Sequence, residues 1–142
     1  MNRLSCITLG VLLSTSVFAQ QDTRNPLDPQ YKPPSYSDIH NGGGNMSQAE
    51  YMKYCERTWT DAGSKTIDKS NPRYSEYQMS PRFGLMDKNG DGAISQEEYM
   101  AFHEKAWNDM KHGDPLAMSQ EEYKQSYSDT RNPLHPSFKR EM

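Results

Sequence analysis

The sequence predicts an all-α protein that forms one small domain. Its 142 residues suffice for a single domain. After Phe18 the chain has no Val and only three Ile, so the β-branched residues that favour strands are nearly absent. Three segments share the pattern Ser-Gln-x-Glu-Tyr, which is typical of helix starts. These observations predict helices packed over a core of Tyr, Trp, Phe and Met.

The three Ser-Gln-x-Glu-Tyr segments predict helices that begin directly after Ser47, Ser95 and Ser119. In each segment the Ser hydroxyl can accept a hydrogen bond from an amide of the first turn, and the Glu three residues later can reach back to the Ser amide. The first two helices belong to a longer repeat, since residues 46–61 and 94–109 are identical at eight of sixteen positions.

Changes in composition divide the rest of the chain. Residues 20–45 are rich in Pro, Gly, Asn, Tyr and Ser, which predicts an extended, mobile arm. The helical domain is expected over residues 46–127, with a shorter helical stretch over 71–86 that Pro81 interrupts. Residues 128–142 form a C-terminal tail.

Two segments near the ends of the chain carry the same six residues. Asp-Thr-Arg-Asn-Pro-Leu occurs at 22–27 and again at 129–134. Asn-Pro is an ordinary turn former. We therefore interpret both copies as turns at the edges of the domain rather than as a docking motif.

Residues 1–19 have the pattern of a cleavable secretory signal. Arg3 precedes an apolar run that ends at Ala19, before the polar Gln20. The run is too short, and too interrupted by Ser and Thr, to span a membrane, and no later segment approaches the ~20 consecutive apolar residues that a span needs. We therefore expect a periplasmic or secreted protein with no transmembrane segment after signal cleavage.

The composition after residue 19 disfavours several classes of partner and cross-link. The chain then holds 15 basic and 19 acidic residues, and this negative balance argues against nucleic acid as a partner. Cys55 is the remaining cysteine, so no internal disulfide can form. We expect a monomer, although an exposed Cys55 would allow a disulfide-linked dimer. A small core without cross-links needs another source of stability, and a bound metal ion is a common one.

The segment between Met86 and Tyr99 has the donor spacing of a calcium loop. A Ca2+ ion takes six to eight oxygen ligands at ~2.3–2.6 Å, and a twelve-residue loop supplies them only by turning sharply, which Gly92 permits. Glu98 can offer both carboxylate oxygens, which favours calcium over magnesium. The expected ligands are the side chains of Asp87, Asn89, Asp91 and Glu98, the backbone carbonyl of Ala93, and a water held by Ser95.

These residues resemble the calcium loop of the EF-hand family. The pattern D-x-[DN]-x-[DN]-G-x₅-E is matched from Asp87 to Glu98. The resemblance implies an EF-hand helix-loop-helix pair with one intact calcium loop over 87–98, one degenerate half-hand and an extra C-terminal helix. Together with the predicted signal, it implies a small exported bacterial protein that binds calcium ions as a sensor or a buffer. The alternative is a calcium-stabilised envelope or cell-surface module that presents the arm, including Tyr31 and Tyr36, to a protein partner.

The loops that precede Glu50 and Glu122 depart from this pattern. Ile39 and Lys111 stand where the first carboxylate is needed, so neither loop is predicted to bind calcium. Asp38 would join the first loop only if that loop were one residue longer.

The resemblance also implies that loops pair through their eighth residues, which places Ile94 opposite either Met46 or Met118. A helix that begins at Ile94 would separate it from Met118 by about 25 Å at ~1.5 Å per residue. Met46 is therefore the expected partner of Ile94, with the first loop acting as a structural half-hand.

No enzymatic activity is expected. The histidines after residue 19 are scattered without metal-ligand spacing. Cys55 aligns with His103 in the repeat, but this alignment alone is weak support for a nucleophile and its base. The many methionines are interpreted as core filling rather than as a groove that binds target helices.

Overall fold

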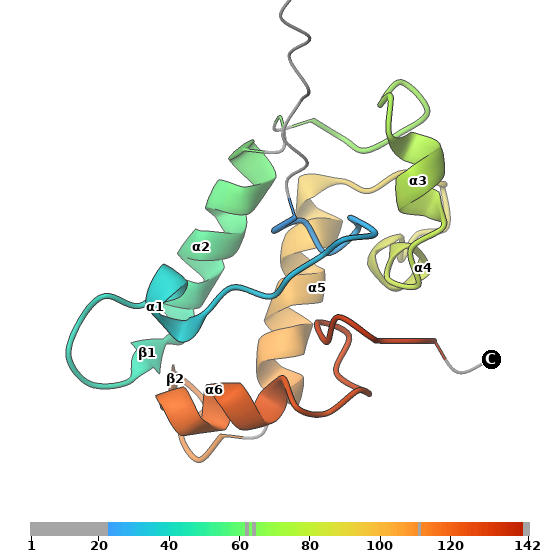
Figure 1. Ribbon diagram of the computed structural model, residues 1–142. Coiled ribbons are helices and arrows are strands. Elements are labelled where there is room, and N and C mark those ends of the chain that lie inside the picture. The colour runs from blue at the N-terminus through green and yellow to red at the C-terminus, as the bar shows by residue number, and fades with distance from the viewer. Residues whose placement is uncertain (1–22, 62, 64, 111, 141–142) are drawn as a thin grey trace, which may run out of the picture.

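The computed structural model describes residues 23–61, 63, 65–110 and 112–140, and the predicted signal lies outside them (Figure 1). The helices in these residues are α1 (Tyr36–Ile39), α2 (Gln48–Asp61), α3 (Tyr74–Gln78), α4 (Phe83–Met86), α5 (Gln96–Asp109) and α6 (Gln120–Ser126). The strands β1 (Met46–Ser47) and β2 (Ala117–Met118) form a small sheet. The described chain is therefore mainly helical, as the sequence predicts. None of its helices combines the length and the apolar character needed to cross a membrane.

Helices α2 and α5 lie side by side at the centre of the molecule (Figure 1). At one end, β1 before α2 pairs antiparallel with β2 after α5, so that Met46 faces Met118. At the other end, Ile67 after α2 pairs with Ile94 before α5 through N–H···O=C bonds of 2.9 and 3.0 Å. The two helices are therefore antiparallel, and main-chain pairing joins them at both ends.

The expected pairing of Ile94 with Met46 is wrong. Each central helix has 14 residues, which corresponds to ~21 Å of length at ~1.5 Å per residue. Because α2 and α5 run in opposite directions, the loops that precede them lie at opposite ends of the pair. Ile94 instead pairs with Ile67, in a segment that carries no Ser-Gln-x-Glu-Tyr signal.

The predicted helix starts are confirmed. At the start of α5, the Glu98 amide donates to Ser95 Oγ (3.2 Å) and the Ser95 amide donates to Glu98 Oε2 (3.0 Å). The same reciprocal bonds join Ser119 and Glu122 at the start of α6. Ser47 completes the set, since its amide donates to the carboxylate three residues later at 2.8 Å. Each helix start thereby satisfies amides that have no partner inside the helix.

The core between the central helices is aromatic. The rings of Tyr51 and Trp107 are 5.2 Å apart, and those of Trp59 and Tyr99 are 5.1 Å apart. Aromatic pairs at this separation contribute about 0.5–1.5 kcal/mol beyond their buried area. The other buried apolar side chains include Tyr54, Ile67, Phe83, Met86, Ile94, Phe102, Met110, Met118 and Tyr123. Four of the seven methionines in the described residues are therefore buried in the core, in line with their interpretation as core filling.

Residues 23–34 pack against this core, although their composition predicts a mobile arm. Leu27 is fully buried and Tyr31 is 6% exposed. The turn interpretation of the repeated hexapeptide is confirmed, because the Leu27 amide donates to Asn25 Oδ1 and the Leu134 amide donates to Asn132 Oδ1, at 3.0 and 2.9 Å. Leu134 is buried as well. Each turn thus inserts a leucine into the core. The composition of the arm does not predict this contact, because Pro and Gly are abundant there.

Truncating the leucine of the first turn tests whether this segment is part of the folded core. Leu27→Ala should lower the free energy of unfolding by about 2–5 kcal/mol, because it leaves a cavity in a fully buried site. Met79→Ala is the control, since Met79 is 86% exposed and should change stability by less than about 0.5 kcal/mol. Urea denaturation followed by tryptophan fluorescence measures both. Equal effects of the two substitutions would contradict a packed N-terminal segment.

Candidate metal centre

The loop over residues 87–98 connects α4 to the first turn of α5. The Asp87 amide donates to the Phe83 carbonyl at 2.9 Å and so ends α4. Gly90 and Gly92 have φ angles of +72° and +79°, which glycine adopts without a steric penalty. These two positions let the chain reverse direction within a few residues, so that the side chains of the loop face inward.

The first three predicted ligands lie around the backbone amides of this turn. Asp87 accepts hydrogen bonds from the amides of Asp91 (3.1 Å) and Gly92 (3.0 Å), one on each carboxylate oxygen. Asn89 Oδ1 accepts from the Asp91 amide at 2.9 Å. Asp91 Oδ1 accepts from the Ala93 amide, also at 2.9 Å. The structure therefore brings three oxygen-bearing side chains to the inner side of one tight turn.

Glu98 closes the loop from the other end. Its Oε1 atom accepts from the amides of Lys88 (3.1 Å) and Asn89 (3.3 Å), at the beginning of the loop. Its Oε2 atom accepts from the amide and the hydroxyl of Ser95, at 3.0 and 3.2 Å. Glu98 therefore reaches the backbone at the beginning of the loop, and Ser95 acts here as the helix cap.

The donor chemistry of the loop fits a hard divalent cation. Its inward side chains offer carboxylate and amide oxygens, and Asn89 and Asp91 are exposed at the open side of the loop. Their oxygens face backbone amides, and no group of three or more His, Cys, Asp or Glu side chains in the described ranges is arranged as a ready set of metal ligands. Bidentate binding of a cation would require Glu98 to exchange the amide donors on Oε1, and a Ser95 donor on Oε2, for the ion.

Tyr74 supports this loop and was missed by the sequence analysis. Its hydroxyl, on the first residue of α3, donates to the Gly92 carbonyl. Its ring packs edge-on against Phe83, with 5.8 Å between centroids. A Cβ atom at Gly92 would lie 3.4 Å from the Tyr74 hydroxyl, which is an ordinary contact distance, so the positive φ angle is what favours glycine here. The loop motif gives no signal for a partner 18 residues upstream.

The loops before Glu50 and Glu122 satisfy the corresponding carboxylates without an ion. Glu50 Oε1 lies 3.0 Å from His40 Nδ1, and Glu122 Oε1 accepts from the Gly113 amide at 2.8 Å. Hydrogen bonds from Ser47 hold the pKa of Glu50 at about 2, and those from Ser119 and Gly113 do the same for Glu122.

Asp38, which was considered for a longer first loop, has a structural role instead. Asp38 caps α1, where it accepts from the Ser35 amide at 2.7 Å. Lys111 lies outside the described residues.

Cys55 and His103 are both buried between the central helices. Burial raises the pKa of the Cys55 thiol to about 12 and lowers the pKa of His103 to about 3. His103 Nδ1 lies 3.2 Å from the Tyr51 hydroxyl. Because Cys55 is only 2% exposed, the disulfide-linked dimer considered from the sequence would require the helices to separate.

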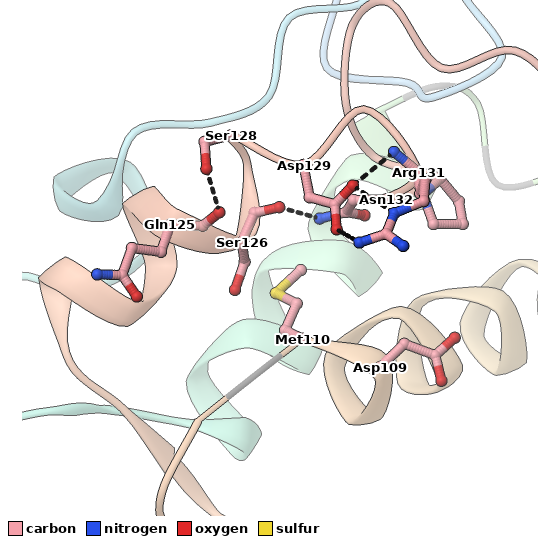
Figure 2. Close-up of a pocket in the computed structure, with 9 residues that line it drawn as sticks. Asp109, Met110, Gln125, Ser126, Ser128, Asp129, Arg131 and Asn132 are labelled. Atoms are coloured by element: carbon pink, nitrogen blue, oxygen red, sulfur yellow. Dashed lines mark hydrogen bonds and ion pairs between the residues drawn. The ribbon is translucent and has the colours of Figure 1, made fainter.

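A pocket of about 530 Å³ lies at the end of α5 opposite the loop over 87–98. Figure 2 shows that Ser128, Asn132, Asp129 and Arg131 are joined to neighbouring groups of the same wall. Arg131 pairs with Asp129 at 2.8 Å, and Asn132 Nδ2 donates to the Ser126 carbonyl at 2.9 Å. The pocket therefore adds no ligands to the candidate centre.

Comparisons with family models, with curated proteins and with solved structures find no match for this chain. The candidate centre is thus defined by its own residues: the turn at Gly90 and Gly92, the carboxylates beside it, and the closing Glu98.

The Cys55 thiol should resist alkylation in the folded protein. The reason is its burial, which hides the sulfur and disfavours the reactive thiolate. Labelling with iodoacetamide followed by mass spectrometry should show a rate that rises steeply across the urea unfolding transition. Labelling at the same rate with and without urea, or a covalent dimer on a non-reducing gel, would show that Cys55 is accessible.

The neutral state of His103 should make stability depend on pH. Its pKa is about 3 in the folded chain, below the ordinary value of 6.5, so the unfolded chain binds more protons between these values. The free energy of unfolding should therefore fall as the pH decreases from about 6.5 toward 3. Urea midpoints measured between pH 7 and pH 5 check this slope above the range in which Glu50 and Glu122 contribute.

His103→Gln should flatten that slope, because glutamine does not take up a proton in either state. An unchanged slope in His103→Gln would mean that other groups cause the pH dependence.

Proposed function

We propose that this chain is an exported calcium-binding protein of the EF-hand type, which acts as a calcium sensor or buffer. The observation that carries the proposal is the closure of the loop by Glu98, whose Oε1 atom reaches the amides of Lys88 and Asn89. A carboxylate in this position can move onto an ion at the loop centre while Ser95 keeps the helix start in place.

The ligand set follows from the donors of the loop. Asp87, Asn89 and Asp91 would each give a side-chain oxygen, Glu98 two, Ala93 its carbonyl, and Ser95 a bound water. The three carboxylates repel one another when they are brought together, and the charge of a bound calcium ion relieves this repulsion. Binding and the ordering of the loop should therefore be coupled.

The pairing of loops supports the EF-hand interpretation, although the loop over 87–98 pairs with a different segment from the one expected. The loop over 87–98 is joined to the segment at Ile67, and the first loop is joined to the third through Met46 and Met118. In this arrangement α2 and α5 are each flanked by a paired segment at both ends. The first and third loops then act as structural halves, since Ile39 and Lys111 stand where their first carboxylate would be needed.

The alternative role, presentation of the Tyr- and Pro-rich arm to a partner, receives less support. The Tyr36 hydroxyl accepts from the Met46 amide (2.7 Å) and donates to the Met118 carbonyl (3.0 Å), so it stabilises the strand pair. The Tyr123 hydroxyl donates to the Pro34 carbonyl at 2.7 Å. These arm residues are thus engaged within the chain, which favours the calcium-binding role itself.

The repeated helix caps provide a matched test of calcium binding. Glu98→Gln should weaken binding by about tenfold or more, equivalent to ~1.4 kcal/mol or more, because it removes a charge and a bidentate ligand. Glu50→Gln and Glu122→Gln are the controls, and each should leave calcium affinity within about twofold of the unmodified chain. All three variants keep a side chain that can complete the capping box. Isothermal titration calorimetry measures the affinities.

Two results would contradict the proposal. One is the absence of heat and stoichiometric uptake when the unmodified chain is titrated with millimolar calcium. The other is an equal loss of affinity in all three variants, which would assign the effect to the helix caps rather than to the loop.

A further inference from the structure

We propose that Arg82 couples the docking of two terminal segments, residues 25–32 and 132–138, so that neither stays docked when the other is released. This inference goes beyond calcium binding and does not depend on it. It rests on where the guanidinium lies: Arg82 immediately precedes α4 and is 4% exposed, between the two copies of the repeated turn.

The guanidinium is held by backbone carbonyls from both segments. Within the described part of the chain, Nη1 donates to the Pro26 carbonyl (3.1 Å), Nε donates to the Pro133 carbonyl (2.5 Å) and Nη2 donates to the His135 carbonyl (2.6 Å). The first acceptor belongs to the N-terminal segment, and the other two belong to the C-terminal segment. Pro26 and Pro133 are equivalent positions of the repeated hexapeptide.

Each segment also supplies an aromatic ring. The guanidinium carbon lies 4.9 Å from the centroid of the Tyr31 ring and 6.0 Å from that of Phe138. Both distances are within the range of cation–π attraction. Each terminal segment therefore contributes a carbonyl and a ring to the same cation.

Arg82 has no ion-pair partner among the described residues. Its charge is stabilised by neutral carbonyl dipoles and by aromatic faces, and burial lowers the pKa of its guanidinium. A buried cation without a carboxylate depends on every acceptor that it has. The loss of any one of them leaves a donor unpaired in a site that water reaches poorly.

This dependence makes the two segments cooperative. If the C-terminal segment is released, Arg82 loses two acceptors and the Phe138 ring while the N-terminal segment still shields it. If the N-terminal segment is released, the converse holds. Either half-docked state leaves unpaired donors, so the states with both segments docked or both released are favoured over it. Leu27 and Leu134, which lie in one core cluster, add apolar burial to the docked state.

Hydrogen exchange of the full chain, measured by mass spectrometry, tests this coupling. The reporters are amides bonded within their own segment, such as Tyr31 to the Asp28 carbonyl (3.0 Å) and His135 to the Asn132 carbonyl (2.8 Å). Arg82→Gln should speed exchange in both segments by roughly tenfold or more. Leu134→Ala, which loosens the C-terminal segment and leaves Arg82 unchanged, should also speed exchange in residues 25–32.

The matched control is Arg131→Gln, which lies in the same copy of the hexapeptide as Leu134. Arg131 is exposed and pairs with Asp129, so its removal should leave exchange in both segments unchanged. Amides of α2 and α5 serve as the internal reference for global unfolding. If Arg82→Gln does not fold, Leu134→Ala decides the question, because it leaves the guanidinium in place.

Two outcomes would overturn the proposal. In the first, Leu134→Ala speeds exchange only in residues 132–138, or speeds both segments no more than it speeds the central helices. In the second, folded Arg82→Gln retains the exchange rates of the unmodified chain in either segment. Either result would show that the two turns dock independently.

Discussion

The structure depends on the main-chain pairing that joins α2 and α5 at both ends. Side-chain packing between two helices sets their crossing angle and distance. It does not by itself set the positions of the segments that precede and follow the helices. Here Met46 with Met118, and Ile67 with Ile94, hold the four flanking segments at defined positions. The loop over 87–98 is consequently held at the pairing of Ile94 and at the start of α5.

Three helix starts in this chain use one device and differ in a single respect. In all three, a serine and a glutamate cap the helix reciprocally, and this leaves one carboxylate oxygen available. Glu50 uses that oxygen for His40, Glu122 for the Gly113 amide, and Glu98 for the amides of Lys88 and Asn89. The last case brings the carboxylate to the loop that also carries Asp87, Asn89 and Asp91, and the proposed calcium site rests on this difference.

The sequence predicts the parts of the fold that depend on neighbouring residues. The caps at Ser47, Ser95 and Ser119, and the turn at Gly92, follow from contacts within a few positions. The parts that it does not predict are partners far along the chain: Ile67 for Ile94, which carries no motif, and the packing of the arm through Leu27. The abundance of Pro and Gly predicts a mobile arm. The packing of the arm against the core depends instead on Leu27 and on carbonyl groups that accept hydrogen bonds from Arg82.

Arg82 is the clearest case of a residue that local patterns cannot identify. It stands in a short helical stretch with no motif, yet its acceptors lie 51 to 56 residues away in both directions. The repeated hexapeptide does give a signal, since two identical turns are more simply explained by a shared partner than by two separate ones. A planar guanidinium has donors on several sides and can accept both. In a chain with few aliphatic residues, the buried hydrogen bonds of Arg82 add to the stability that a small apolar core provides. Because these bonds are directional, they also specify which segments pack against Arg82.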